Sequence, residues 1–161
     1  IATGDFEAMA HYAGPMDRWV ILPVMRVIGR RRRERILAAG SLEAAVRPLG
    51  PDGSIPGMEG WRWMHTPGHT PGHVAFVRSH DRVVISGDAL LTLRVNAAAG
   101  FLLGSQGLSA PPWYTTWDRE AARSSIRAIA ALEPAVLAGG HGLPLSGPGT
   151  AAAVSGFAAG R

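Results

Sequence analysis

The sequence predicts an α/β fold, and three observations lead to this prediction. Short apolar or alternating runs at residues 61–66, 74–77 and 83–85 are typical of strands that are at least half buried. Residues 118–133 repeat their apolar positions with the period of an amphipathic helix. Because another apolar run, 135–138, follows this helix, we expect a strand that returns parallel to residues 83–85.

The composition is that of a globular protein. With 161 residues, 47% hydrophobic and 17% charged, we expect residues 1–161 to form a single domain. The absence of cysteine excludes disulfides, thiolate metal ligands and cysteine nucleophiles. All 16 basic residues are arginine, but the net charge of +4 is too modest to identify an anionic partner.

The sequence indicates a cytoplasmic protein without a membrane span. Its most apolar stretch, residues 19–29, is interrupted by Pro23 and Arg26 and is too short to cross a bilayer. The chain starts at Ile1 rather than at a methionine, and its first residues read as the end of a buried strand. We therefore expect the C-terminal part of a longer protein.

Two helices and a loop are expected before the first strand. Residues 5–13 have the pattern of a short helix, and 23–39 that of a second one with a proline in its first turn. Gly40 should end it, and the glycines and prolines of 41–60 indicate a connecting loop.

The second helix carries the run Arg30 to Arg33. This run could hold phosphate, an anionic lipid surface or an acidic substrate, although a solvated helix face is the simpler interpretation. No aromatic residues are interleaved with it, and no groove-reading motif is present. We therefore expect no nucleic-acid partner.

The candidate site centres on the turn Thr66-Pro-Gly-His69-Thr-Pro-Gly-His73, whose backbone is restricted by proline. Asp88 follows the strand at 83–85, and the hairpin topology places it beside this turn. His141 follows the parallel strand at 135–138 and should reach the same sheet edge. The alternative is that these histidines are ordinary polar turn residues.

Residues 89–117 are predicted to be a long loop without a helix or strand of useful length. Long loops of this kind are often binding elements. The loop contains Leu90, Leu91 and Leu93 among other apolar residues, and the aromatic residues Trp113, Tyr114 and Trp117. We expect the aromatic residues to bind an acyl or lactone substrate; the alternative is that they anchor the loop to the core.

Residues 60–145 resemble the metallo-β-lactamase-fold hydrolases, through the TPGHTPGH turn, the Gly-Asp at 88 and the Gly-His-Gly around 141. The resemblance implies an αββα sandwich of two mixed sheets. It also implies that His69 ligates one metal, that Asp88 bridges two as the catalytic carboxylate, and that His141 ligates the other. His73 would be a supporting residue in the turn.

The resemblance departs from the family pattern in one respect: the upstream HxHxDH motif of that family is absent. We therefore expect an incomplete sandwich that lacks the N-terminal strands, and a chain that is inactive by itself. A metal-free relative is the alternative.

For the complete enzyme the resemblance implies a binuclear hydrolase with two divalent metal ions. Zinc is the first expectation, and iron or manganese would also suit nitrogen and oxygen ligands. A metal-bridging hydroxide would attack an ester, thioester or lactone bond of a small-molecule substrate. Alternatives are a noncatalytic binding module and a metal-dependent nuclease or phosphodiesterase. A glyoxalase II type is disfavoured because only 20 residues follow His141.

Overall fold

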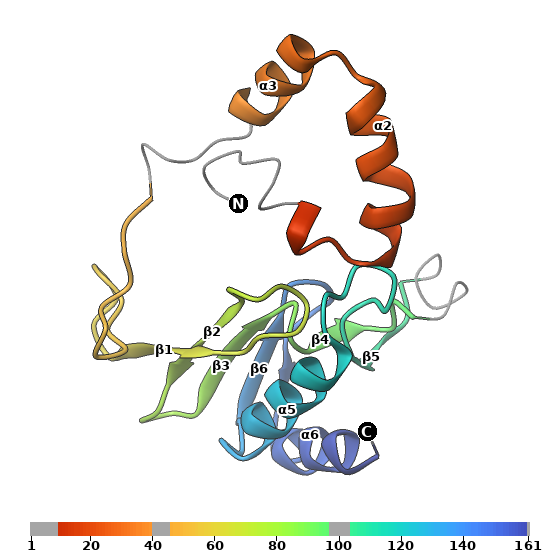
Figure 1. The fold of residues 1–161 in the computed structure, drawn as a ribbon. Helices are drawn as coiled ribbons and strands as arrows, with labels where there is room; N and C mark the ends of the chain where they lie inside the picture. Colours follow the sequence, from red (N-terminus) through yellow and green to blue (C-terminus); the bar gives the residue numbers. More distant parts are fainter. Residues whose placement is uncertain (1–9, 40–45, 97–103, 161) are drawn as a thin grey trace.

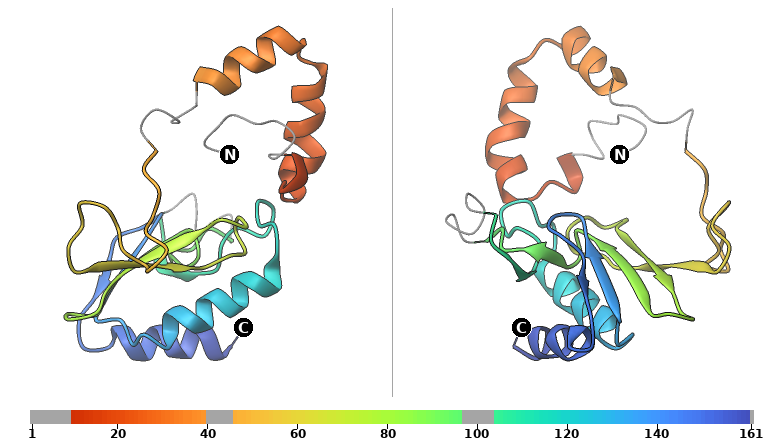
Figure 2. Two further views of the ribbon diagram at one scale, coloured as in Figure 1. Left: turned by 60° about the vertical axis from the view of Figure 1, so that its left-hand side comes forward. Right: turned by 180° about the vertical axis from the view of Figure 1, so that it is seen from behind.

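The computed structural model describes residues 10–39, 46–96 and 104–160 of the chain. A mixed β-sheet lies at the centre, and two helices run side by side beneath it, α5 (Arg119–Ala130) and α6 (Thr150–Ala159) (Figure 1). The N-terminal helices α2 (Leu22–Val27) and α3 (Arg30–Ala39) form an arch that extends away from the sheet in every view (Figure 2). The fold is therefore α/β, as predicted.

The larger sheet has five strands in the order β1-β2-β3-β6-β7. β1, β2 and β3 form an antiparallel meander, β6 pairs in parallel with β3, and β7 pairs antiparallel with β6. The strands span Trp61–His65, Val74–Arg78, Val83–Gly87, Val136–Gly139 and Leu145–Ser146. The four predicted strands, the hairpin and the parallel return are thus confirmed.

The parallel return is made by helix α5, Arg119–Ala130. The Asp118 side chain caps it by accepting hydrogen bonds from the amides of Glu120 and Ala121, a role that aspartate commonly takes at this position. The amphipathic pattern is confirmed as well, because Ile126 and Ile129 are 1% and 0% exposed. α5 and the C-terminal helix α6, Thr150–Ala159, cover one face of the sheet and form the core with it.

The prediction of a structureless loop at residues 89–117 is wrong in part. β4, Leu91–Leu93, pairs antiparallel with β5, Gln106–Ser109, in a second, two-stranded sheet. Leu90 and Leu91 are fully buried, so they belong to the core. The sequence does not predict β4 and β5 because each is only three or four residues long, and the two strands that pair are separated by a long segment of the chain.

The single helix expected at 23–39 is divided in two. A π-helix, η1, covers Asp17–Ile21 and continues into α2, Leu22–Val27, and a break at Ile28 and Gly29 precedes α3, Arg30–Ala39. Glycine is unfavourable in the interior of a helix, and Gly29 therefore accounts for the position of the break.

Other N-terminal expectations are tested only in part. Most of the helix expected at 5–13, and Gly40, lie outside the described residues. Residues 46–60 form turns and loop segments, as predicted. In the arginine run, Arg30 pairs with Glu34 at 2.7 Å while its side chain stays 84% exposed, which agrees with a solvated helix face at that residue.

Within the described parts of the chain, no helix combines the length and the apolar character that crossing a bilayer requires.

Truncating the core face of α5 should destabilise the fold. Ile126→Ala and Ile129→Ala should each lower the free energy of unfolding by ~2–5 kcal/mol, because each leaves a cavity against the sheet. Chemical denaturation measures this loss. Ser124→Ala, an exposed position on the same helix, is the matched control and should change stability by less than ~0.5 kcal/mol. Equal effects at all three positions would contradict the packing described.

Candidate metal centre

The turn that carries His69 is held against the start of α5. The amide of Asp118 donates to the Gly68 carbonyl at 3.0 Å, and that of Trp117 donates to the His69 carbonyl at 3.2 Å. The Ser125 hydroxyl donates to the Pro67 carbonyl at 2.7 Å. These contacts fix the backbone on both sides of His69.

Gly68 is required where the turn touches the helix. Its φ is +136°, and a Cβ at this position would overlap the backbone of Ala122. Only glycine lets the turn approach α5 so closely. The sequence motif therefore reflects a steric requirement as well as a candidate ligand.

His73 supports Asp88 from the other end of the same turn. Its Nε2 accepts a hydrogen bond from the Asp88 amide at 3.0 Å, and its Nδ1 lies 2.8 Å from the Thr66 hydroxyl. Since Nε2 is the acceptor, the ring proton resides on Nδ1 and the ring is neutral. Burial lowers the pKa of His73 from its usual value, which favours this neutral form.

His141 is positioned by the second sheet. The Thr92 amide and hydroxyl both donate to the His141 carbonyl at 3.1 Å, and the Gly140 amide donates to the Gly87 carbonyl at 2.8 Å. Thr92 is 3% exposed, so this double contact is shielded from water. Sequence reasoning missed Thr92, because its role depends on a strand that the sequence did not reveal.

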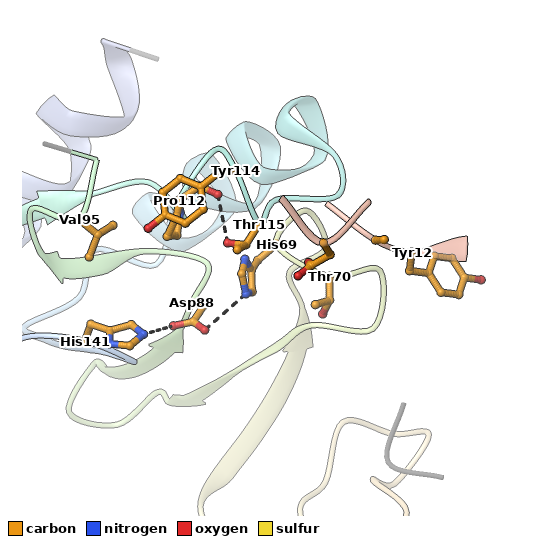
Figure 3. A pocket seen from close by; sticks show the side chains of 11 residues that line it. Tyr12, His69, Thr70, Asp88, Val95, Pro112, Tyr114, Thr115 and His141 are labelled. Atoms are coloured by element: carbon orange, nitrogen blue, oxygen red, sulfur yellow. Dashed lines mark hydrogen bonds and ion pairs between the residues drawn. The ribbon is translucent and has the colours of Figure 1, made fainter. Parts of the chain in front are cut away.

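The structure brings His69, Asp88 and His141 together (Figure 3). The His69 Nε2 lies 3.6 Å from Asp88 Oδ2, and the His141 Nε2 lies 3.6 Å from Asp88 Oδ1. Each carboxylate oxygen thus faces a different histidine. The side chains are 20%, 33% and 55% exposed for His69, Asp88 and His141, so the cluster opens to solvent on the His141 side.

These separations fit a metal better than direct hydrogen bonds. At 3.6 Å, both pairs lie beyond the usual N–H···O distance of about 2.7–3.2 Å. Two donor atoms bound to one metal at ~2.0–2.2 Å would be separated by roughly 3–4 Å. His69 Nδ1 is also buried without a hydrogen-bond partner. The donor set of two imidazoles and one carboxylate therefore suits divalent metals.

The described residues provide only part of a metal coordination sphere. No group of three or more histidine, aspartate or glutamate side chains gathers around a common point in residues 10–39, 46–96 and 104–160. Each histidine faces only one oxygen of Asp88, so each metal would have two donor atoms from these residues. A stable site needs three or four protein ligands.

Comparison with known proteins identifies the family of the chain. The family model described as the metallo-beta-lactamase superfamily matches residues 8–141, most of the chain. The chain belongs to the metallo-β-lactamase superfamily. The resemblance inferred from the three motifs is therefore confirmed, together with the fold class.

Two curated relatives come from Bacillus subtilis strain 168. A probable metallo-hydrolase, YflN, is 43% identical over 106 residues, which are 66% of this chain and 40% of YflN. An uncharacterized protein, YobT, is 35% identical over 83 residues, 52% of this chain and 34% of YobT. The chain thus spans less than half the length of both relatives.

Two solved structures are also similar to the chain. TTHA1429 of Thermus thermophilus, a metallo-beta-lactamase family protein, is 20% identical with a TM-score of 0.46, covering 96% of this chain and 46% of that one. TTHA1623, solved in a di-iron-bound form, is 30% identical with a TM-score of 0.42, covering 84% of this chain and 58% of that one.

In this superfamily member the three candidate ligands line a hollow of about 410 Å³. Its other walls come from the N-terminal segment, the turn after β1, and the segments on either side of the second sheet. The lining residues are Tyr12, Ala13, Asp17, His69, Thr70, Asp88, Val95, Pro112, Tyr114, Thr115 and His141. We call this the metal hollow.

The three aromatic residues predicted to bind substrate do not line one hollow, although the Trp113 and Tyr114 rings are in edge contact with centroids 5.7 Å apart. Tyr114 lines the metal hollow, whereas Trp113 lines a different one and Trp117 lines neither. Trp113 and Trp117 are both exposed, which argues against a role as core anchors. Tyr12 and Asp17 line the metal hollow and were missed, because nothing in their local sequence connects them with the distant ligands.

The N-terminal wall of the metal hollow is attached by close backbone contact. The Met16 amide donates to the Tyr114 carbonyl at 2.6 Å. A Cβ at Gly14 would lie 2.6 Å from the Thr115 carbonyl carbon, so a larger residue would push the two segments apart. This contact holds Tyr12 and Asp17 at the rim.

Gly68→Ala should displace the His69 turn from α5, because both its φ and the backbone of Ala122 exclude a methyl group. We expect a stability loss of more than ~1 kcal/mol by thermal or chemical unfolding. The matched control is Gly72→Ala in the same turn, where no atom lies within 4 Å of an added Cβ and φ is not positive. If the two substitutions are equally tolerated, the proposed steric constraint is incorrect.

Proposed function

We propose that the metal hollow is the active site of a binuclear metal-dependent hydrolase. Asp88 bridges two divalent ions, His69 binds one of them and His141 binds the other. The observation that carries this proposal is the placement of each Asp88 oxygen 3.6 Å from a different histidine nitrogen. A carboxylate with its two oxygens directed at separate partners has the geometry that a bridging ligand needs.

Two bound divalent ions would lower the pKa of a bound water to near neutral pH. Their positive charge would also stabilise a developing oxyanion. Zinc is the metal that we propose first, and iron or manganese would suit the same nitrogen and oxygen donors. The similar protein TTHA1623 was solved in a di-iron-bound form. Metal binding should therefore be measured with zinc, iron(II) and manganese.

Several residues of this chain prepare the site without holding a metal. His73 fixes the Asp88 backbone through its hydrogen bond to the amide and so orients the carboxylate. Thr92 does the same for His141 through the carbonyl contact. Supporting contacts of this kind keep ligands in place before a metal arrives.

The walls of the metal hollow favour a small acyl or lactone substrate. Val95, Pro112 and Tyr114 supply apolar and aromatic surface beside the candidate ligands. No arginine lines the hollow among the described residues, so its walls offer no guanidinium group to pair with a phosphodiester backbone. This favours an ester, thioester or lactone hydrolase over the nuclease alternative.

We propose further that the whole protein supplies the remaining ligands, because two donors per metal are too few for tight binding. The chain of 161 residues by itself would be inactive in hydrolysis. A noncatalytic, metal-free relative is the competing proposal, and metal binding distinguishes the two.

Calorimetric titration of the chain with zinc, iron(II) or manganese should detect weak binding. His69→Ala and His141→Ala should each lower the metal affinity by at least about tenfold. Loss of a residue that only supports a ligand already costs about 10–100-fold in affinity, and loss of a ligand should cost no less. Asp88→Ala should abolish metal binding. His80→Ala, in the β2–β3 turn away from the site, is the control. Tight binding that survives His69→Ala would show that the ligand assignment is wrong.

Substrate binding can be tested in the whole protein with p-nitrophenyl octanoate and a lactone. Tyr114→Ala should lower kcat/KM by about 10–200-fold, the usual effect of losing apolar contact in a binding pocket, while Tyr114→Phe retains most of it. Trp113→Ala and Trp117→Ala should have smaller effects, since neither side chain lines the metal hollow. A larger loss at Trp113 than at Tyr114 would contradict this assignment.

A further inference from the structure

A second hollow is lined in part by the same segment that carries Tyr114. It has a volume of about 260 Å³ and shares no lining residue with the metal hollow. Its lining consists of Asn96, Ala110, Pro111, Trp113, Thr116, Arg119, Ala122, Arg123 and Ile126. We call it the arginine–tryptophan hollow.

One side of the arginine–tryptophan hollow is apolar. Trp113 is 54% exposed, although a large aromatic side chain gains free energy by burial. Ala122 and Ile126, both nearly fully buried, belong to the core face of α5 at the bottom of the hollow. A flat apolar ligand placed here would cover the indole ring and contact this floor.

The other side is cationic. Arg119 and Arg123 are four residues apart on α5, which places them on the same helix face. The Arg119 guanidinium lies 5.7 Å from the centroid of the Trp113 ring. Within the described residues neither arginine forms an ion pair, and no aspartate or glutamate lines the hollow. The positive charge is therefore available to a ligand.

The rim of the hollow is fixed by its own hydrogen bonds. Asn96 donates to the Ser109 hydroxyl at 3.1 Å and to the Ala110 carbonyl at 2.9 Å, and it accepts from the Trp113 amide at 3.4 Å. The Thr116 hydroxyl donates to the Pro112 carbonyl at 2.6 Å. A rim that is already ordered lowers the entropic cost of binding.

We propose that the arginine–tryptophan hollow binds a small amphipathic carboxylate. The flat apolar part of the ligand stacks on Trp113, and its carboxylate pairs with Arg119 and Arg123. Arginine suits this role because its planar guanidinium can donate two parallel hydrogen bonds to a carboxylate. The volume lies below the ~300–1,000 Å³ of sites for drug-sized ligands, which selects a small organic acid.

This proposal is independent of the proposed hydrolase activity, since the two hollows have separate linings. It needs neither metal nor catalysis, and it can be tested with the chain alone. The probe is 1-naphthaleneacetate, which joins a flat aromatic body to one carboxylate. The matched probes are its neutral amide, 1-naphthaleneacetamide, and the cation 1-naphthylmethylamine.

Binding is followed by nuclear magnetic resonance through the indole N–H signals, with Trp113→Phe identifying the relevant one. We expect saturable binding of the carboxylate, weaker binding of the amide and none of the amine. The double variant R119Q/R123Q should weaken carboxylate binding by about tenfold or more, because two charge-assisted hydrogen bonds are lost. Trp113→Ala should weaken binding of both the carboxylate and the amide.

The control is R18Q/R26Q, which removes the same charge from exposed arginines outside the hollow and should bind like the unmodified chain. Thermal melts of all variants verify that each is folded. His141→Ala should leave binding unchanged, because His141 belongs to the metal hollow. Equal binding of amide and carboxylate, insensitivity to R119Q/R123Q, loss of binding in His141→Ala, or no saturable binding of the carboxylate would each overturn the proposal.

Discussion

The parallel pairing of β3 with β6 is the constraint on which the candidate metal centre depends. It places Val84 opposite Leu137 and Gly87 opposite Gly139, with an irregularity after Ile85. Irregular pairing of this kind redirects the chain where a strand ends. As a result, Asp88 and His141 emerge next to each other although 52 residues lie between them in the sequence. The same pairing requires α5 to cross the sheet, and α5 in turn supports the turn with His69.

Close backbone contacts then convert this topology into a defined geometry. At Gly140 an added Cβ would overlap the Asp88 carboxylate, and at Gly142 it would lie 2.6 Å from the Thr92 carbonyl carbon. Glycine on both sides of His141 therefore lets the loop after β6 lie directly on the loop after β3 and on β4. The glycines of the motif are steric requirements of the site, and the histidine is the chemical group they position.

Much of this arrangement could be predicted from the sequence because it follows from local patterns. Strand periodicity, an amphipathic helix and the rule for parallel connections were sufficient to bring His69, Asp88 and His141 together. The sequence did not reveal Thr92 or Asp17, whose roles arise only when distant segments meet. The sequence also groups Trp113 with Tyr114, because the two residues are adjacent in the chain. In the structure they lie in a turn, and their side chains line different hollows although the two rings are in edge contact.

This turn links the two hollows through a single stretch of backbone. Trp113 and Tyr114 are consecutive, yet one lines the arginine–tryptophan hollow and the other the metal hollow. A deletion or insertion of one residue between Pro111 and Asp118 would change the direction of both side chains and disturb both hollows at once. The edge contact between the two rings, whose centroids are 5.7 Å apart, couples the hollows further. During divergence of related proteins, the length of this segment should therefore be strictly limited.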